Sequence, residues 1–212
     1  IKNNFKNYNF HKLQKELLNF CALDLSSFYF DIRKDILYCD DLNSKKRKSC
    51  VSVLNITLEC LIKWYAPVLS FTTEEISELA QNNKKRSIHE ENFPKIPNKW
   101  KNDVLFEKWE KLLKVRQQVN VAIEEKRSNK IIGSSLEADI EITLPKDEFD
   151  ILKKIDAKEL FITSNVIQNI SKDKNNEISV IVKKAKGIKC SRCWKIVEKV
   201  KEGKCSRCSS IK

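Results

Sequence analysis

Hydrophobic positions recur every three or four residues through most of the first eighty, the spacing of one buried face of an α-helix. Polar breaks divide this pattern into four predicted helices. Pro67 ends the third, and Thr72 with Glu75 three residues later has the pattern of a capping box that opens the fourth. The apolar stripes of the first three helices begin at Phe10, Leu25 and Cys50, and the fourth helix is expected to run from Thr72 through Ala80. Short connections between such helices are typical of an antiparallel bundle.

A linker with Pro94 and Pro97 is predicted over residues 82–98, so the bundle is expected to occupy residues 1–98. The helical period then returns in a long predicted helix over residues 99–127. After Gly133 it changes to strict alternation, which predicts a half-buried strand over residues 136–144.

A short helix at 147–156 and strands at Leu160–Thr163 and Ile178–Val182 complete a small α/β unit over residues 99–183. With a final segment over residues 184–212, the fold class is mainly α, a helical bundle followed by a small α/β unit and a cysteine-rich end.

Four of the eight cysteines form two C-x2-C pairs separated by eleven residues, Cys190 with Cys193 and Cys205 with Cys208. Two such pairs supply the four thiolates of a tetrahedral structural zinc site, with no position left for catalysis. A disulfide would need an oxidising compartment, and a redox C-x2-C would need to open a helix in a βαβ fold. The other cysteines lie on helical stripes and are expected to be reduced thiols.

The chain carries 41 basic and 29 acidic residues, and the excess is concentrated at one end, where residues 183–212 hold 11 basic and 2 acidic side chains. A dense basic segment is typical of polyanion binding. Cations beside an aromatic ring suit phosphate contact with base stacking. Candidate RNA contacts in this segment are Arg192, Trp194, Lys195, Lys199, Lys201, Lys204 and Arg207.

The chain lacks the sequence motifs of several classes of enzyme. The three glycines are too far apart for a phosphate-binding loop, and there is no HExxH and no nucleophile elbow. We therefore expect no catalytic and no cofactor-binding residue in this chain. Neither a membrane span nor a secretory signal is visible, so a cytoplasmic location is expected. The absence of Met, with Ile1 at the start, indicates a piece of a longer polypeptide.

Ordered blocks across nearly the whole chain resemble the isoleucyl-tRNA synthetases. The blocks are LSSFYFDI at 25–32 with Lys34, Asp35, Leu37 and Tyr38, APVL at 66–69, FTTEEI at 71–76, Arg116, Val119, Glu124, Arg127, IGSSLEA at 132–138, and the two cysteine pairs. The resemblance departs at Ile36 and Ser77, where many members have Arg and Trp. The family's nucleotide-binding and editing domains are not in this chain.

The resemblance implies an anticodon-binding bundle and a zinc finger from an enzyme that joins isoleucine to its tRNA. It implies that ATP and Mg²⁺ belong to the missing catalytic domain, and that this portion binds tRNA through the Lys45–Lys48 run, Arg116, Arg127 and the basic end. We expect one Zn²⁺, a monomer, and no contact with DNA or membranes.

Two other classes carry a similar zinc-bearing end. A DNA-repair glycosylase would need a catalytic N-terminal residue and a helix-two-turn-helix before the finger, whereas a strand and an α/β unit precede it here. An unrelated zinc-ribbon module that binds protein partners would show no selectivity for an anticodon.

Overall fold

The computed structural model describes residues 1–80, 86–171 and 177–211. It divides into two compact units, both discontinuous in sequence: unit 1 comprises Ile1–Asp31 and Leu42–Lys101, and unit 2 comprises Ile32–Asp41 and Asn102–Lys212. The predicted boundaries at residues 98 and 183 stay predictions. Part of the predicted linker, residues 82–85, lies outside the described residues. Among the described helices, none is both long and apolar enough to cross a bilayer.

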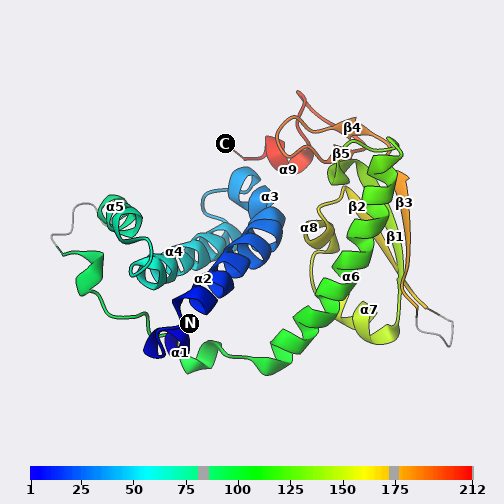
Figure 1. Ribbon diagram of the computed structural model, residues 1–212. Helices are drawn as coiled ribbons and strands as arrows, with labels where there is room; N and C mark the ends of the chain where they lie inside the picture. Colours follow the sequence, from blue (N-terminus) through cyan, green and yellow to red (C-terminus); the bar gives the residue numbers. More distant parts are fainter. Residues whose placement is uncertain (81–85, 172–176, 212) are drawn as a thin grey trace. The chain divides into compact units, whose positions relative to one another are not determined.

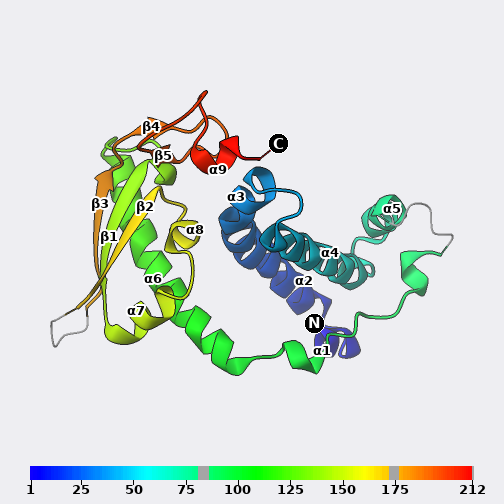
Figure 2. The same ribbon diagram turned by 180° about the vertical axis from the view of Figure 1, so that it is seen from behind.

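Unit 1 is helical (Figures 1 and 2). Its buried side chains include Leu13 and Leu17, which have no exposed surface. Ile62 and Ala66 pack with Ile88 in a second small core. Its elements are α1 (Lys2–Lys6), α2 (Phe10–Asn19), the π-helical segment η1 (Phe20–Phe30), α4 (Lys45–Tyr65), α5 (Ser70–Ala80), and the 3-10 turns η2 (Ile88–Glu90) and η3 (Asn98–Trp100).

The first two predicted helices follow one another without a break. α2 passes directly into η1, whose wider turn lets the Ser27 hydroxyl donate to the Ala22 carbonyl oxygen, five residues earlier, at 2.8 Å. The capping box at Thr72 is wrong, because α5 begins two residues earlier, at Ser70. The carboxylate of Glu74 has another role: its Oε2 accepts hydrogen bonds from the Ser87 hydroxyl at 2.8 Å and the Ile88 amide at 3.0 Å.

Unit 2 is built around a three-stranded sheet in the order β2-β1-β3. The central strand pairs in parallel with β2 and antiparallel with β3. The long helix α6 lies along this sheet in both views (Figures 1 and 2) and packs against β3, α7 and α8. The elements are α3 (Asp31–Cys39), α6 (Asp103–Ser128), η4 (Ser135–Glu137), β1 (Ala138–Leu144), α7 (Lys146–Leu152), α8 (Ala157–Phe161), β2 (Asn165–Ile170), β3 (Ser179–Lys184), β4 (Ile188–Lys189), β5 (Ile196–Val197) and α9 (Ser206–Ser209).

The predicted alternation in β1 is confirmed, since every second side chain from Ala138 to Leu144 is buried. One predicted strand is wrong: Leu160 and Phe161 belong to the helix α8, and the strand follows at Asn165. Asp156 caps this helix, because its side chain accepts hydrogen bonds from the Lys158 and Glu159 amides. Ile162 ends the helix in a left-handed conformation with φ of 56°. These end signals override a short apolar run.

The helix α3 is the part of the N-terminal sequence that belongs to unit 2. Arg33 forms an ion pair with Glu159 of α8. Ile32 and Ile36 are buried on the same helix, at 4% and 3% exposure. Because the partners of α3 lie more than a hundred residues away, the local period of its sequence predicts the helix but not its place in the fold.

Candidate metal centre and RNA-binding surface

The four predicted ligands come together in unit 2. The sulfur atoms of Cys190, Cys193, Cys205 and Cys208 all lie within 4.8 Å of one another, and all four residues are buried. The Cys193 and Cys205 sulfurs are 3.8 Å apart. A tetrahedron with Zn–S bonds of about 2.3 Å places sulfurs roughly 3.8 Å apart, so these residues fit a tetrahedral metal ion. Among the described residues, no other group of His, Cys, Asp or Glu comes together in this way.

Two short ribbons hold the cysteines in place. In the first, β4 pairs antiparallel with β5, and the Trp194 amide donates to the Cys190 carbonyl oxygen at 3.0 Å to close the knuckle. The second turns between Lys201 and Lys204, which exchange backbone hydrogen bonds. The Ser191 amide donates to the Gly203 carbonyl oxygen at 2.8 Å and joins the two ribbons. A sequence too short for its own apolar core is thereby folded around the thiols.

The four thiols differ in how readily they lose a proton when no metal ion is bound. Burial alone would raise the pKa of the Cys190 thiol, but backbone hydrogen bonds from Cys193, Cys205 and Arg192 lower the pKa to about 6. Burial raises the pKa values of the Cys193 and Cys208 thiols. A metal ion supplies the positive charge that four thiolates in this small volume require.

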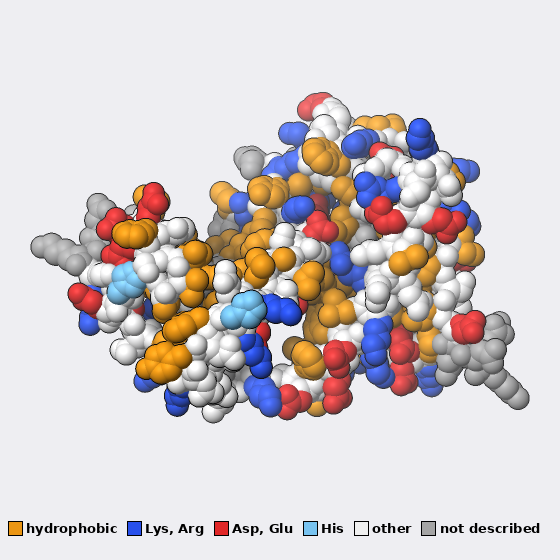
Figure 3. Space-filling view, viewed as in Figure 1, with side chains coloured by type: hydrophobic (Ala, Val, Ile, Leu, Met, Phe, Trp, Pro, Cys, Tyr) orange, Lys and Arg blue, Asp and Glu red, His pale blue; other side chains and the backbone are white. Residues whose placement is uncertain are grey.

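Three of the six predicted basic contacts in the ribbons are exposed, and a fourth, Arg192, is half-buried. Lys199, Lys201 and Lys204 are exposed, and Trp194 keeps 59% of its surface exposed with a φ of 64°. Figure 3 shows Lys and Arg side chains around the region that β4 and β5 occupy in Figure 1. The Lys189 ammonium lies 5.6 Å from the centre of the Trp194 ring. Sequence reasoning missed Lys189, although its place just before Cys190 in a hairpin is a usable signal.

Two of the predicted contacts face α3 instead. Arg207 donates from both terminal nitrogens to the Asp35 carboxylate, at 2.6 Å each, and Lys195 Nζ lies 3.4 Å from the same group. Burial alone would raise the pKa of Asp35, but hydrogen bonding by Arg207 and the charges of Lys195 and Arg207 lower it below its ordinary value. In the sequence, Asp35 stands out only through the resemblance to the isoleucyl-tRNA synthetases, and no local pattern connects it with Arg207.

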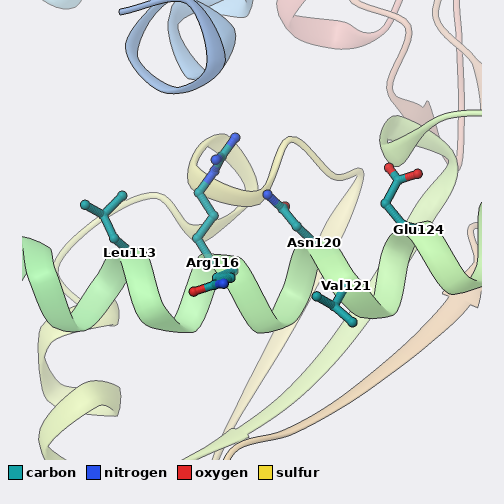
Figure 4. Close-up of a pocket in the computed structure, with 6 residues that line it drawn as sticks. Leu113, Arg116, Asn120, Val121 and Glu124 are labelled. Carbon is teal, nitrogen blue, oxygen red and sulfur yellow. The ribbon is translucent and has the colours of Figure 1, made fainter. Parts of the chain in front are cut away.

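The predicted arginines of α6 are placed differently from one another. Arg116 donates from Nε to the Leu160 carbonyl oxygen at 3.1 Å. Arg127 is exposed and pairs with Glu124 at 2.6 Å. A hollow of about 460 Å³ follows this helix, and Figure 4 shows the residues that project from one side of it. They are Leu113, Arg116, Asn120 and Glu124. Asn120 is a polar group of this surface that the sequence did not single out.

The Lys45–Lys48 run forms the first turn of α4 in unit 1. Ser44 caps the helix by accepting from the Arg47 amide, and Lys45, Lys46 and Lys48 are exposed. Cations at this end oppose the helix dipole, whose positive end lies at the N-terminus. The structure therefore presents two exposed basic surfaces, one in each unit.

Residues 1–142 match the family described as the anticodon-binding domain of tRNA ligase. This match covers more than half of the chain, and the chain belongs to that family of anticodon-binding domains. Curated proteins to which the chain is similar include isoleucine–tRNA ligases. The chain is 54% identical over 196 residues to that of Pelagibacter ubique, 40% identical over 210 residues to that of Agrobacterium fabrum, and 41% identical over 191 residues to that of Methylacidiphilum infernorum.

These alignments cover 90 to 92% of this chain and 20 to 21% of each relative. The chain thus spans about a fifth of the length of the curated relatives it matches. The cysteine cluster at 190–208 lies beyond the residues matched by the family, within a chain whose similarity to the relatives extends over most of its length. The alternative of a DNA-repair protein is not favoured by these similarities.

Proposed function

We propose that this chain is the tRNA-recognition portion of an isoleucine–tRNA ligase and that it binds the anticodon region of isoleucine tRNA. The observation that carries the proposal is the combination of an anticodon-binding domain with a buried four-cysteine cluster beneath an exposed, basic, tryptophan-bearing surface. Single-stranded bases of an anticodon loop expose faces for stacking and edges for hydrogen bonds, which a helical unit and such a surface can each use.

The metal of the cluster is Zn²⁺ in this proposal. Four thiolates with no histidine or carboxylate among them suit zinc, and a site that is fully occupied by protein ligands is structural. Cys190, Cys193, Cys205 and Cys208 hold the ion, which supplies folding free energy to the ribbons and no chemistry.

The contacts to RNA are divided between stacking and charge. Trp194 supplies the aromatic face, and the cations of the same segment neutralise phosphates. Arg116 and Arg127 on α6 and the Lys45–Lys48 run extend the basic surface within their own units. The cations proposed for this role are Lys189, which lies 5.6 Å from the centre of the Trp194 ring, and Arg192, Lys199, Lys201 and Lys204 of the same segment.

The whole protein attaches isoleucine to tRNA at the expense of ATP, through an aminoacyl-adenylate. The nucleotide and its Mg²⁺ are bound outside the present residues, where the remaining four fifths of each relative lie. A cytoplasmic monomer that contacts neither DNA nor membranes accords with this role.

The test is competition between two tRNAs for the zinc-loaded chain. Isoleucine tRNA with its native anticodon is expected to bind better than the same tRNA with a changed anticodon. Equal binding to both, lost steeply as salt rises, would contradict anticodon recognition and leave only a non-specific basic surface.

Two variants separate the contribution of charge to tRNA affinity from that of stacking. Lys204→Ala should weaken binding of both tRNAs alike and lower the slope of log K against log salt by somewhat less than one, about 0.7 for a single-stranded site. Trp194→Ala should reduce affinity with little change in this slope, because no phosphate contact is lost.

A further inference from the structure

Two ion pairs between α3 and the metal-binding segment, residues 188–209, converge on the carboxylate of Asp35. Both oxygens of Asp35 accept from Arg207, at 2.6 Å each, in a bidentate pair. Lys195 Nζ lies 3.4 Å from the same group, and Asp40 adds a longer contact of 3.4 Å to Arg207. Planar bidentate pairing fixes both distance and direction, which a single contact between point charges does not.

This contact is partly shielded from water. The side chains of Asp35 and Lys195 keep only 24% and 19% of their surface exposed, and that of Arg207 keeps 37%. Beside it, Cys39 of α3 is 5% exposed, packs against the four cysteines and lies with its sulfur 3.6 Å from the Arg192 carbonyl oxygen. Charged and apolar contacts therefore hold the metal-binding segment on the same helix.

The pairing separates the basic residues of the segment into two kinds. Lys199, Lys201 and Lys204 point to solvent, whereas Arg207 and Lys195 are committed to an acidic partner. An arginine that already holds a carboxylate with both terminal nitrogens has little left to offer a phosphate. Its charge is also largely cancelled by Asp35 at short range.

We propose that Asp35 is a positioning residue for RNA recognition, which orients the metal-binding segment on α3 by pairing with Arg207 and Lys195. Trp194 and the exposed lysines are then presented to RNA in one fixed orientation. This role replaces the direct RNA contact that the sequence predicts for Arg207 and Lys195. The proposal rests on the tRNA-binding function proposed above, although the docking itself does not depend on RNA.

Whether Asp35→Asn weakens or strengthens tRNA binding distinguishes a positioning role of Asp35 from a simple effect of its charge. Asp35→Asn removes a negative charge, so electrostatics alone would make tRNA binding stronger. If Asp35 positions the segment, binding of isoleucine tRNA to the zinc-loaded full chain weakens. We expect a loss of about tenfold, which is typical of the interaction energy between two side chains in direct contact. The slope of log K against log salt stays unchanged, because no phosphate contact is removed. Binding that is equal or stronger would overturn the proposal.

Glu198→Gln is the matched control, since it removes one negative charge, as Asp35→Asn does, but at an exposed position of the metal-binding segment. Its tRNA binding should be unchanged or slightly stronger. The double variant Asp35→Asn with Arg207→Gln should bind no more weakly than Asp35→Asn alone, because the two side chains act as one pair. Additive losses would assign Arg207 an RNA contact of its own and refute its reassignment.

Hydrogen exchange without RNA tests the docking separately. In zinc-loaded Asp35→Asn, amides of α3 and of residues 188–209 should exchange faster than in the parent, with metal content unchanged. Unchanged exchange would contradict docking through Asp35. If the parent chain shows no preference for the native anticodon, the proposed function fails, while this measurement still decides whether Asp35 holds the segment.

Discussion

At the scale of single residues, Tyr65 and Cys21 face each other in unit 1, with the phenol oxygen 3.9 Å from the sulfur. Burial raises the pKa of Tyr65 to about 12, and the neighbouring Cys21 adds to the shift. The ordinary value for this phenol is 10.0. The native protein therefore keeps a proton at Tyr65 between these two pH values that the unfolded chain has already released.

The sign of the resulting pH dependence follows from linkage. The unfolded state binds fewer protons in this window, so the free energy of unfolding falls as pH rises from 10 towards 12 and is unaffected well below 10. Tyr65→Phe should flatten this fall. Urea unfolding at about pH 9 and pH 11 measures the difference. Tyr38→Phe is the control, because Tyr38 is 75% exposed, and a pH dependence equal in both variants would contradict the assignment.

At the scale of elements, the β4–β5 ribbon depends on the residue just before it. Gly187 has a φ of 139°, and a Cβ there would lie 2.4 Å from the Val197 carbonyl oxygen. Both the backbone conformation and the available space therefore require glycine at this position. Because the neighbour is backbone of the paired strand, it cannot move aside without opening the ribbon that carries Cys190.

Gly187→Ala should accordingly loosen the metal centre. We expect a cost of about 2 kcal/mol or more to the ribbon and faster loss of metal to a chelator. Gly133→Ala is the matched control, since its nearest neighbour would be a Glu137 side-chain oxygen at 3.5 Å and its φ is not in the left-handed range. Equal rates of metal release from the two variants would show that the ribbon tolerates the distortion.

Elements with a local signal could be predicted from the sequence, and contacts between distant elements could not. The period of 3.6 predicted α6, and the period of two predicted β1, because both are properties of neighbouring residues. The four cysteines were found by their spacing. The short apolar run at Leu160 fits a strand or a helix equally well, and the cap at Asp156 is what makes it a helix. Asp35 carries no signal of its partnership with Arg207, 172 residues away.

At the scale of the whole molecule, the metal centre lies in unit 2, whereas most of the predicted bundle lies in unit 1. Each unit has its own buried side chains, such as Leu13 and Leu17 in unit 1 and Ile140 and Ile142 in unit 2. Since the ribbons lack a core of their own, loss of the metal should affect them first.

Replacing Cys190 and Cys193 by Ser should abolish metal binding and unfold residues 188–209, while the far-ultraviolet circular dichroism of the helices stays nearly unchanged. Metal content and the dichroism spectrum measure the two effects. Cys21→Ser is the control, because Cys21 lies outside the cluster and its loss should leave the metal in place. Loss of helical signal together with metal would show that the chain folds as one unit, and that the predicted boundary near residue 184 is wrong.

The pairing of Asp35 with Arg207 also sets the order in which the protein can be assembled on the ribosome. The partners are 172 residues apart, and synthesis proceeds at about 5–20 residues per second, so Arg207 is made roughly 10 to 30 s after Asp35. During that time the sheet and α6 can form, but the metal-binding segment does not yet exist. Metal binding and docking on α3 therefore come after the sheet and α6 of unit 2 have been made. A shortage of metal during synthesis would leave these elements folded without the contact of Asp35 with Arg207 and Lys195.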